Sequence, residues 1–213
     1  MSQRLRIALT KGRLQDRSVS LFERMGLDCA PVKDPGRRLI HQLPNYPLDV
    51  VLAKAPDVIT YVEHGVCDLG VVGKDTILEK GGSFYEVLDL GFGKCRFALA
   101  VEAGSDFYGT YKTRRIASKY PGVTRAFFEK KGMDVDIIKI EGSVELAPIL
   151  GLADGIVDIV ETGATLRENG LVPIEDVARI SARLIVNTAS MKLHKRQILD
   201  FIERCEQQLE VET

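Results

Sequence analysis

The segment GIVDIVETGATL, residues 155–166, decides the fold class of this chain. It is an apolar run that ends in the acid Glu161, followed by a turn made of Thr162, Gly163, Ala164 and Thr165. The run predicts a buried strand over residues 156–160, and the turn predicts the start of a helix. Such a turn can bind a sugar phosphate, because the carboxylate accepts from ribose hydroxyls while the Thr hydroxyls and backbone N–H groups hold the phosphate. An ordinary strand-to-helix turn with a capping Thr has the same pattern, so both interpretations stay open at this point.

An earlier segment repeats this one. Residues 65–73 align without gaps with residues 155–163, and Gly, Asp and Gly recur at the first, fourth and ninth positions. Both copies follow a predicted helix and end a predicted strand. We therefore expect two related lobes, with a ligand bound in the cleft where the C-terminal strand ends of the two lobes face each other.

Strands and helices alternate along the rest of the chain, which predicts an α/β protein. We expect strands at residues 5–9, 39–42, 50–53, 69–72, 97–101, 115–118 and 135–140, and helices at 12–25 and 58–65 and from about residues 121 and 143. The last segment has apolar residues on one helical face, which predicts an amphipathic helix that packs on the first lobe or forms a subunit interface. The expected lobes are residues 1–92 with 178–213, and residues 93–177.

Composition excludes several classes of function. The 213 residues carry 29 Lys and Arg against 30 Asp and Glu, a net charge of −1, so we expect no bulk affinity for nucleic acid or membranes. No apolar run reaches the length of a membrane span, and residues 1–11 do not have the pattern of a signal peptide. Cys29, Cys67, Cys95 and Cys205 lack metal or redox spacing, which favours small buried hydrophobic residues in a cytoplasmic protein.

Basic residues follow several of the expected strands. Lys11 and Arg13 lie where the first strand gives way to a helix, a position that favours an anion. Lys54 ends the strand at 50–53, and Lys74 follows the first copy of the repeat. One polyanion would account for these cations together, although solvated surface charges remain the alternative interpretation. Arg37 lies in a loop after an Asp-Pro-Gly turn and would contribute only if that loop folds over the ligand.

Five motifs together resemble the short form of the ATP phosphoribosyltransferase family. They are ALTKGR at 8–13, YVEHGVCDLGVVGKD at 61–75, RIASKYP at 115–121, GSVELAP at 142–148 and DIVETGATL at 158–166, in the order of the family and over essentially the whole chain. The resemblance implies a two-lobed fold like the type II periplasmic binding proteins. It also implies the first step of histidine biosynthesis, in which N1 of the ATP adenine attacks C1 of phosphoribosyl pyrophosphate (PRPP) and releases pyrophosphate.

The resemblance further implies site residues and partners. Glu161, Thr162, Gly163, Ala164 and Thr165 would bind the ribose and 5-phosphate of PRPP in the second lobe. Arg13 and Arg37 would act in catalysis on the departing pyrophosphate, and Lys11, Lys54, Gly73, Lys74 and Asp75 would border ATP in the first lobe. Mg²⁺ would be bound by the substrate, with no metal ligand assigned to the protein. The chain would form a homodimer within a hetero-oligomer that contains a regulatory subunit resembling histidyl-tRNA synthetase.

Two alternatives remain beside this interpretation. A solute-binding protein with the same two-lobed shape would bind an anion without chemistry, but the chain lacks an export signal. A nucleobase-salvage phosphoribosyltransferase usually has two adjacent acids before the threonines, whereas Val160 precedes the single acid Glu161 here. No aromatic residue is clearly placed to stack on adenine, so the adenine pocket stays unassigned.

Overall fold

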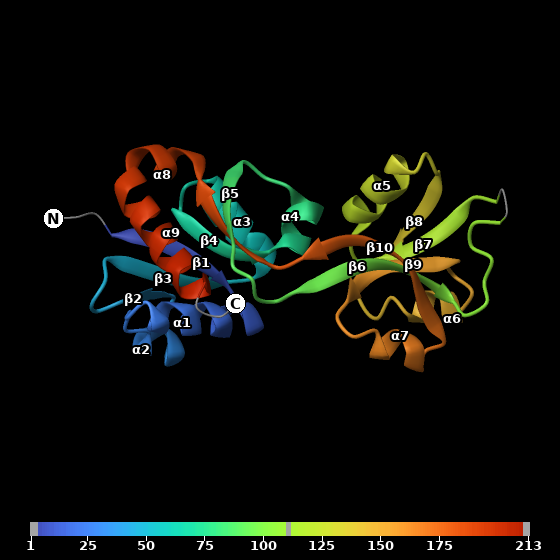
Figure 1. Cartoon of the computed structure of the whole chain (residues 1–213), viewed down its shortest axis with the longest axis horizontal. Helices are drawn as coiled ribbons and strands as arrows, with labels where there is room; N and C mark the ends of the chain where they lie inside the picture. Colours follow the sequence, from blue (N-terminus) through green and yellow to red (C-terminus); the bar gives the residue numbers. More distant parts are fainter. Residues whose placement is uncertain (1–3, 110–111, 211–213) are drawn as a thin grey trace. The chain divides into compact units, whose positions relative to one another are not determined.

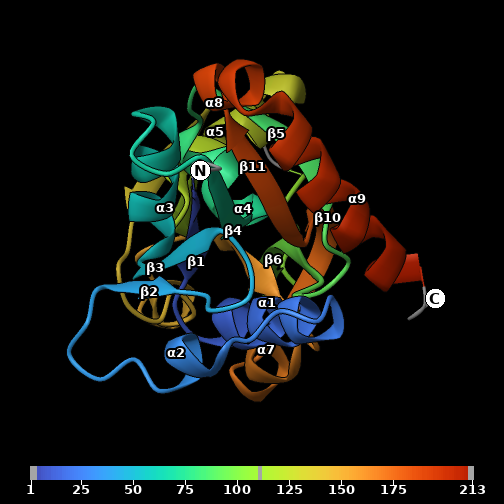
Figure 2. The same ribbon diagram turned by 90° about the vertical axis from the view of Figure 1, so that its left-hand side faces the viewer.

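The computed structural model of the chain describes residues 4–109 and 112–210 (Figures 1 and 2). The chain folds into two compact units. The first unit contains the chain up to Gly93 and again from Ser181 onward, and the second unit is Lys94–Ile180. Each unit is built on one mixed sheet with helices on both faces, as expected for an α/β protein.

The sheet of the first unit has six strands in the order β2-β3-β1-β4-β11-β5. The strands are β1 (Leu5–Thr10), β2 (Ile40–Gln42), β3 (Leu48–Ala53), β4 (Leu69–Gly73), β5 (Phe84–Asp89) and β11 (Ala182–Asn187). The three central strands β3, β1 and β4 are parallel, and β2, β11 and β5 each run antiparallel to their neighbours. The parallel strands therefore end at one common edge of the sheet, where ligands of α/β proteins usually bind.

Helices cover both faces of this sheet (Figure 2). They are α1 (Arg13–Arg24), α2 (Ala30–Lys33), α3 (Ala55–Glu63), α4 (Lys74–Lys80), α8 (Thr188–Leu193) and α9 (Lys195–Glu210). One hydrophobic core combines side chains from α1 and α9 with one face of the sheet, and Phe22 meets Phe201 edge to face at 5.6 Å between ring centroids. A second core lies under α3 and contains Val58, Ile59 and Val62.

The sheet of the second unit has five strands in the order β10-β6-β9-β7-β8. The strands are β6 (Cys95–Glu102), β7 (Arg114–Ser118), β8 (Val135–Lys139), β9 (Gly155–Val160) and β10 (Leu171–Ile180). The helix α5 (Pro121–Lys130) packs on one face through Val123 and Phe128. The short helices α6 (Leu146–Ile149) and α7 (Ala164–Glu168) pack on the other face through Ala147 and Leu166.

The two sheets share one topology, because β3-β1-β4-β11-β5 corresponds strand by strand, with the same directions, to β8-β7-β9-β6-β10. Equivalent hydrogen bonds occur at the start of β1 and at the start of β7. Asp68 accepts the N–H of Arg6 through its carboxylate at 2.8 Å, and Asp154 accepts the N–H of Arg115 in the same way at 2.8 Å. The two units are therefore related copies.

The structure corrects the alignment of the repeat by four residues. Gly65 and Gly151 both have φ near +70° at the end of a helix, and Asp68 and Asp154 follow each at the same spacing. The predicted alignment of Gly65 with Gly155 was wrong because the pattern Gly-x-x-Asp occurs twice in succession in residues 151–158. The inference of two equivalent central strands, β4 and β9, does not depend on this shift.

Several elements differ from the sequence-based expectations. The helix expected from Ser143 begins only at Leu146, because residues 143–145 form a turn. The strands β5, β10 and β11 were not predicted, and Pro173 together with two register shifts explains the weak strand pattern of β10.

All four cysteines are free thiols, and Cys95 is half-buried where burial was expected. Within residues 4–109 and 112–210, no helix has the length and apolar character needed to cross a bilayer.

Candidate active site

A hollow of about 250 Å³ lies at the C-terminal end of β9 in the second unit. It is lined by the five residues predicted to bind a sugar phosphate, Glu161, Thr162, Gly163, Ala164 and Thr165, together with Glu145, Asp158, Ile159, Val160 and Leu166. The strand and the helix α7 form its walls, and the predicted turn connects them. The hollow has the size of a small polar group such as a sugar or a phosphate.

The turn at the mouth of this hollow has a defined geometry. Gly163 adopts φ 73° and ψ 11°, a left-handed conformation in which a side chain would be strained. The carbonyl of Thr162 accepts from Nη1 of Arg167 at 3.2 Å, and the Thr162 hydroxyl accepts the N–H of Ala164 at 3.3 Å. The side chains of Thr162 and Thr165 are exposed. The glycine thus lets the chain reverse tightly while two hydroxyls remain available to a ligand.

Two carboxylates that the sequence analysis did not select also line the hollow, Asp158 and Glu145. Asp158 lies on β9 opposite Ala98 of β6, on the face covered by α6 and α7. Burial raises the pKa of Asp158, the charge of Glu145 raises it further, and an N–H of the backbone and the charge of Lys119 oppose the shift. A hydroxyl donor or a cation entering the hollow would lower the electrostatic cost of ionising this group.

In the first unit, three predicted binding positions follow parallel strands. Lys11 comes after β1, Lys54 comes after β3, and Lys74 comes after β4. The ends of β1 and β3 are adjacent, since the N–H of Lys11 donates to the carbonyl of Ala53 at 2.9 Å. The structure therefore brings Lys11 and Lys54 to neighbouring positions at one edge, as the sequence predicted, and both side chains are exposed.

Arg13 is the first residue of α1, directly after the turn at Gly12. Gly12 has φ 91° and ψ −146°, a conformation that an L side chain rarely adopts. This glycine allows the chain to leave β1 and enter α1 within two residues, so Lys11 and Arg13 stay close to the strand end. Arg13 is exposed and lies on the same edge of the sheet as Lys11.

The turn at the end of β4 was predicted to offer Gly73, Lys74 and Asp75 to a nucleotide, but two of these side chains already have contacts within the unit. Lys74 forms an ion pair with Glu86, with 2.5 Å between Nζ and Oε2. The Asp75 carboxylate folds back over Gly73 so closely that a Cβ on this glycine would collide with it. The predicted residues Gly73, Lys74 and Asp75 are adjacent to the other strand ends, but the ammonium of Lys74 is already neutralised within the unit.

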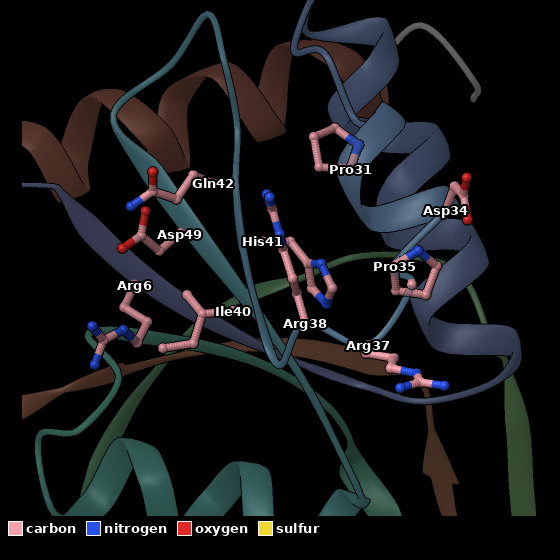
Figure 3. A pocket seen from close by; sticks show the side chains of 11 residues that line it. Arg6, Pro31, Asp34, Pro35, Arg37, Arg38, Ile40, His41, Gln42 and Asp49 are labelled. Atoms are coloured by element: carbon pink, nitrogen blue, oxygen red, sulfur yellow. The ribbon is translucent and has the colours of Figure 1, made fainter.

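Arg37 lies in a larger hollow of about 540 Å³ beside the edge strand β2 (Figure 3). Arg6, Arg38 and His41 line the same hollow, whereas Arg13 is not among its lining residues. Figure 3 shows the Arg38 side chain beside the His41 ring and the Arg37 guanidinium pointing away from both. Because Ile40 pairs with Val51 in antiparallel register, the chain before β2 runs toward the C-terminal end of β3, where Lys54 lies. The loop thus approaches the expected edge, with Arg37 at its rim.

No protein metal centre is evident in the part of the chain that the structure describes. No group of three or more His, Cys, Asp or Glu side chains within residues 4–109 and 112–210 is arranged to hold a metal ion. Glu145, Asp158 and Glu161 share a hollow without forming such a set. Their carboxylate oxygens are of the ligand type that Mg²⁺ accepts.

An α/β chain with an exposed glycine-threonine turn in one unit and basic strand ends in the other has the features of the class of proteins that bind phosphate esters. Residues 54–207 match the family model of HisG, ATP phosphoribosyltransferase. The chain is 59% identical to the ATP phosphoribosyltransferase of Clostridium kluyveri over 97% of its length and 94% of the relative. The chain belongs to the ATP phosphoribosyltransferase family, whose members carry out the first step of histidine biosynthesis.

Solved structures agree with this assignment. The chain is similar to the ATP phosphoribosyl transferase (HisG:HisZ) complex from Thermotoga maritima, with a TM-score of 0.82 and 33% identity over 97% of this chain and 98% of that chain. It also shares its fold with the periplasmic aliphatic sulphonate binding protein SsuA from Escherichia coli, with a TM-score of 0.62 and 13% identity over 98% of this chain and 73% of that one. The expected type II periplasmic-binding-protein fold is therefore confirmed.

Proposed function

We propose that, in the ATP phosphoribosyltransferase reaction of this chain, the turn after β9 holds the ribose and 5-phosphate of PRPP. The observation that carries this proposal is the single hollow lined by all five residues of the turn and by two further carboxylates. Glu161 and Asp158 offer acceptors to the ribose hydroxyls, whereas the Thr162 and Thr165 hydroxyls suit a phosphate. Gly163 adopts the left-handed conformation without strain, so the turn already has this shape before a ligand binds, which lowers the entropic cost of binding.

The basic edge of the first unit is proposed to bind ATP and the leaving group. Lys11 and Lys54 are exposed at adjacent strand ends and suit the triphosphate of ATP. Arg13 and Arg37 are proposed to face the pyrophosphate that leaves C1 of PRPP. Lys54 recognises phosphate as a point charge, without the two-pronged geometry that an arginine offers. The turn of Gly73, Lys74 and Asp75 is proposed to border the nucleotide.

The chemistry requires positioning and charge neutralisation more than a strong base. N1 of adenine is a neutral nucleophile, and the barrier lies in separating pyrophosphate from a sugar carbon that develops positive charge. Holding N1 and C1 in line reduces the entropic part of this barrier. Cations placed at the leaving pyrophosphate stabilise its growing negative charge, and carboxylates near the ribose tolerate the positive charge on the sugar.

Magnesium is proposed to enter as part of the PRPP substrate. The ion prefers oxygen ligands and usually keeps several waters, so it needs few protein ligands. Asp158, Glu145 and Glu161 surround the place proposed for the ribose and offer such oxygens. The family assignment and the donor types support this proposal.

Assembly and location are also proposed. The Thermotoga maritima protein is a HisG:HisZ complex, which supports assembly of this chain with a regulatory subunit, proposed to resemble histidyl-tRNA synthetase. A homodimer within that assembly is proposed as well. The lobes expected from the sequence, 1–92 with 178–213 and 93–177, differ by one to three residues from the two units of the structure, and we propose that the first unit binds the nucleotide and the second binds PRPP. A cytoplasmic location is proposed because both substrates are cytoplasmic metabolites.

The experiment that tests the proposed site measures substrate binding and turnover separately. The full chain is mixed with Mg²⁺, ATP and PRPP, with and without a regulatory subunit, and formation of N1-substituted adenine is followed in the near ultraviolet. Replacing Thr162 and Thr165 together by Val should weaken PRPP binding and leave ATP binding unchanged. Unchanged PRPP binding in this variant would remove the turn from the site, and tight binding of an unrelated anion without turnover would favour a solute-binding role.

A further inference from the structure

A closed circuit of polar contacts in the first unit begins and ends at Lys74, at the end of β4. The backbone N–H of Lys74 donates to the carbonyl of Ser181 at 2.9 Å, and the Ser181 hydroxyl donates to Asp89 at 2.7 Å. Asp89 pairs with Arg183 at 2.9 Å, and Arg183 pairs with Glu86 at 3.2 Å. Glu86 closes the circuit on the Lys74 ammonium at 2.5 Å. The five residues therefore hold one turn from both its backbone and its side chain.

An irregularity in β5 makes the circuit possible. Glu86 and Asp89 are three residues apart, so in a regular strand their side chains would point to opposite faces of the sheet. The register between β5 and β11 shifts there, because Glu86 pairs with Ile185 while Leu88 pairs with Leu184. This bulge at Val87 returns both acids to the face on which Arg183 lies. A single guanidinium can then bridge two carboxylates from one strand.

The charges within the circuit balance. Lys74 and Arg183 supply two positive charges, and Glu86 and Asp89 supply two negative charges. The side chains of Lys74, Glu86 and Arg183 are between 23% and 25% exposed, so the two pairs of Glu86 are partly shielded from solvent, whereas Asp89 is 47% exposed. A phosphate would have to compete with Glu86 for the ammonium of Lys74, whereas nothing competes in this way for Lys11 or Lys54 among the described side chains. Lys74 is thus a poor direct phosphate ligand despite its place at the strand end.

The circuit also includes the residue at which the chain returns to the first unit. Ser181 follows Ile180, the last residue of the second unit, and it is only 6% exposed. The neighbouring Ala182 donates its N–H to the carbonyl of Phe92 at 2.9 Å, so the outgoing and returning segments are joined there. The turn at the end of β4 is therefore hydrogen-bonded to a buried backbone segment, which is itself hydrogen-bonded to the segment that leaves the first unit.

We propose that Glu86, Arg183, Asp89 and Ser181 are positioning residues that hold the turn Gly73-Lys74-Asp75 in its nucleotide-binding conformation, with Lys74 acting as an anchor of that turn. This inference rests on the proposed function, in which the turn borders ATP. It changes the role of Lys74 from a phosphate ligand to a structural partner of Glu86. The ligand-facing groups of the turn are then its backbone and Asp75.

A double-mutant cycle between Lys74 and Glu86 tests the proposal in the full chain. Glu86→Gln, Lys74→Met and the double variant are compared with the parent protein by calorimetric titration with Mg·ATP and, separately, with Mg·PRPP. Each single change should weaken ATP binding about 3- to 10-fold. The double variant should bind ATP at least as tightly as the single variant with the lower affinity, as expected of residues that act as one unit. PRPP binding should stay within about twofold of the parent, because the circuit holds a turn of the first unit, whereas the turn proposed to bind the ribose and 5-phosphate belongs to the second unit.

The direction of the Glu86→Gln effect separates the two roles of Lys74. If Lys74 binds phosphate directly, removing its competitor Glu86 should tighten ATP binding or leave it unchanged, and this result would overturn the proposal. Arg183→Lys keeps the charge but cannot bridge both acids, so it should reproduce most of the Glu86→Gln effect. Additive effects in the double variant, or an equal weakening of PRPP binding, would also overturn the proposal.

A matched control and a second readout separate this proposal from the proposed function. Glu23→Gln removes an acid from the pair with Lys33, which has a distance of 2.7 Å in the same unit, and should leave ATP binding unchanged. Hydrogen exchange of the 69–80 segment should accelerate in Glu86→Gln and not in Glu23→Gln, whatever ligand the protein binds. A parent chain that binds neither substrate would overturn the proposed function, whereas unchanged exchange in Glu86→Gln would overturn the positioning role alone.

Discussion

Glu145 and Asp158 line one hollow at the end of β9, and the charge of Glu145 adds to burial in raising the pKa of Asp158. The two acids come from different parts of the chain, the first just before α6 and the second within β9. A half-buried acid that is costly to ionise and lines a hollow is typical of a functional group rather than a stabilising one. Asp158 is therefore a candidate contact for the ribose hydroxyls of PRPP.

Replacing Asp158 by Asn should stabilise the protein and weaken PRPP binding. The folded-state pKa lies above the ordinary value, so the folded protein binds more protons in the interval between the two values, and stability falls as pH rises through that interval. Asp158→Asn removes this cost, and a gain of about 1 kcal/mol would raise Tm by roughly 2–4 °C at pH 7. The gain should disappear below the ordinary pKa of an Asp, about 3.9.

Thermal unfolding between pH 3 and pH 8 and PRPP titration measure the two effects. The control is Asp136→Asn, which changes an exposed acid on the edge strand β8, separated from β9 by β7, and should alter neither quantity. An Asp158→Asn variant that loses stability at pH 7, or that binds PRPP as well as the parent, would contradict the assigned role.

Replacing Gly163 by Ala should weaken PRPP binding through the backbone of the turn. Gly163 has φ 73°, and a Cβ there would meet Nη1 of Arg167 at 3.2 Å, the far end of a flexible side chain, and Cγ1 of Val160 at 3.7 Å, an ordinary contact distance. The main cost is therefore the left-handed conformation, about 1–2 kcal/mol. Gly151→Ala is the matched control, since Gly151 has φ 70° with nothing within 4 Å of its Cβ position and lies outside the turn.

The two glycine variants should lose similar stability but differ in PRPP binding. Chemical denaturation and PRPP titration distinguish a shared loss of backbone freedom from an effect on the site. Equal weakening of PRPP binding in both variants would show that strain anywhere in the second unit is sufficient, and the turn would lose its special role.

Replacing Arg13 or Arg37 by Ala should lower kcat more than it changes substrate binding. A cation that acts on the leaving pyrophosphate contributes mostly in the transition state, and losing one such group costs about 10² to 10³ in rate. Arg17→Ala is the control for Arg13, because Arg17 is exposed on the same helix one turn further on. Arg38→Ala is the control for Arg37, since its side chain lies beside His41 inside the hollow (Figure 3). A parent-like kcat in Arg13→Ala or Arg37→Ala would exclude that residue from catalysis.

The parts of the site that follow one strand were predictable, because they depend on local sequence. The turn from Glu161 to Thr165 and the cations Lys11 and Lys54 could be placed from an apolar run followed by polar residues. Asp158 and Glu145 were missed because their meeting depends on the packing of α6 against the face of β9. The acid inside an otherwise apolar predicted strand was the one available signal for Asp158.

The pairing of Lys74 with Glu86 could not be predicted for a related reason. The pairing depends on β5 lying beside β11, although these two strands are distant in sequence. It also depends on a one-residue bulge that changes the face of the sheet to which Glu86 points. The predicted alignment of the repeat was wrong for a more local reason. Two successive Gly-x-x-Asp patterns fit the same motif, and only the hydrogen bond from the N–H of Arg115 to the Asp154 carboxylate identifies the pattern that is equivalent to residues 65–68.

Asp154 should therefore stabilise the second unit in a pH-dependent way. Burial acts to raise its pKa, but the N–H of Arg115 and the charges of Lys112, Arg115 and Arg114 outweigh burial, so the pKa is lowered. A lowered folded-state pKa gives stability that is present above the ordinary value of about 3.9 and is lost as pH falls through the lowered value. Asp154→Asn should cost about 1.5–3 kcal/mol at pH 7, the usual contribution of a hydrogen bond to a charged group.

Unfolding of parent and variant between pH 2 and pH 8 measures this contribution. The stability difference between Asp154→Asn and the parent should be constant near neutrality and should shrink toward the acid end, because protonation then removes the same charge from the parent. Asp68→Asn, at the equivalent position of the first unit, should also destabilise the protein, since it weakens the contacts with Arg6 and with the Ser190 hydroxyl at 2.7 Å. A difference that stays constant down to pH 2 would mean that Asp154 acts through its shape and not through its charge.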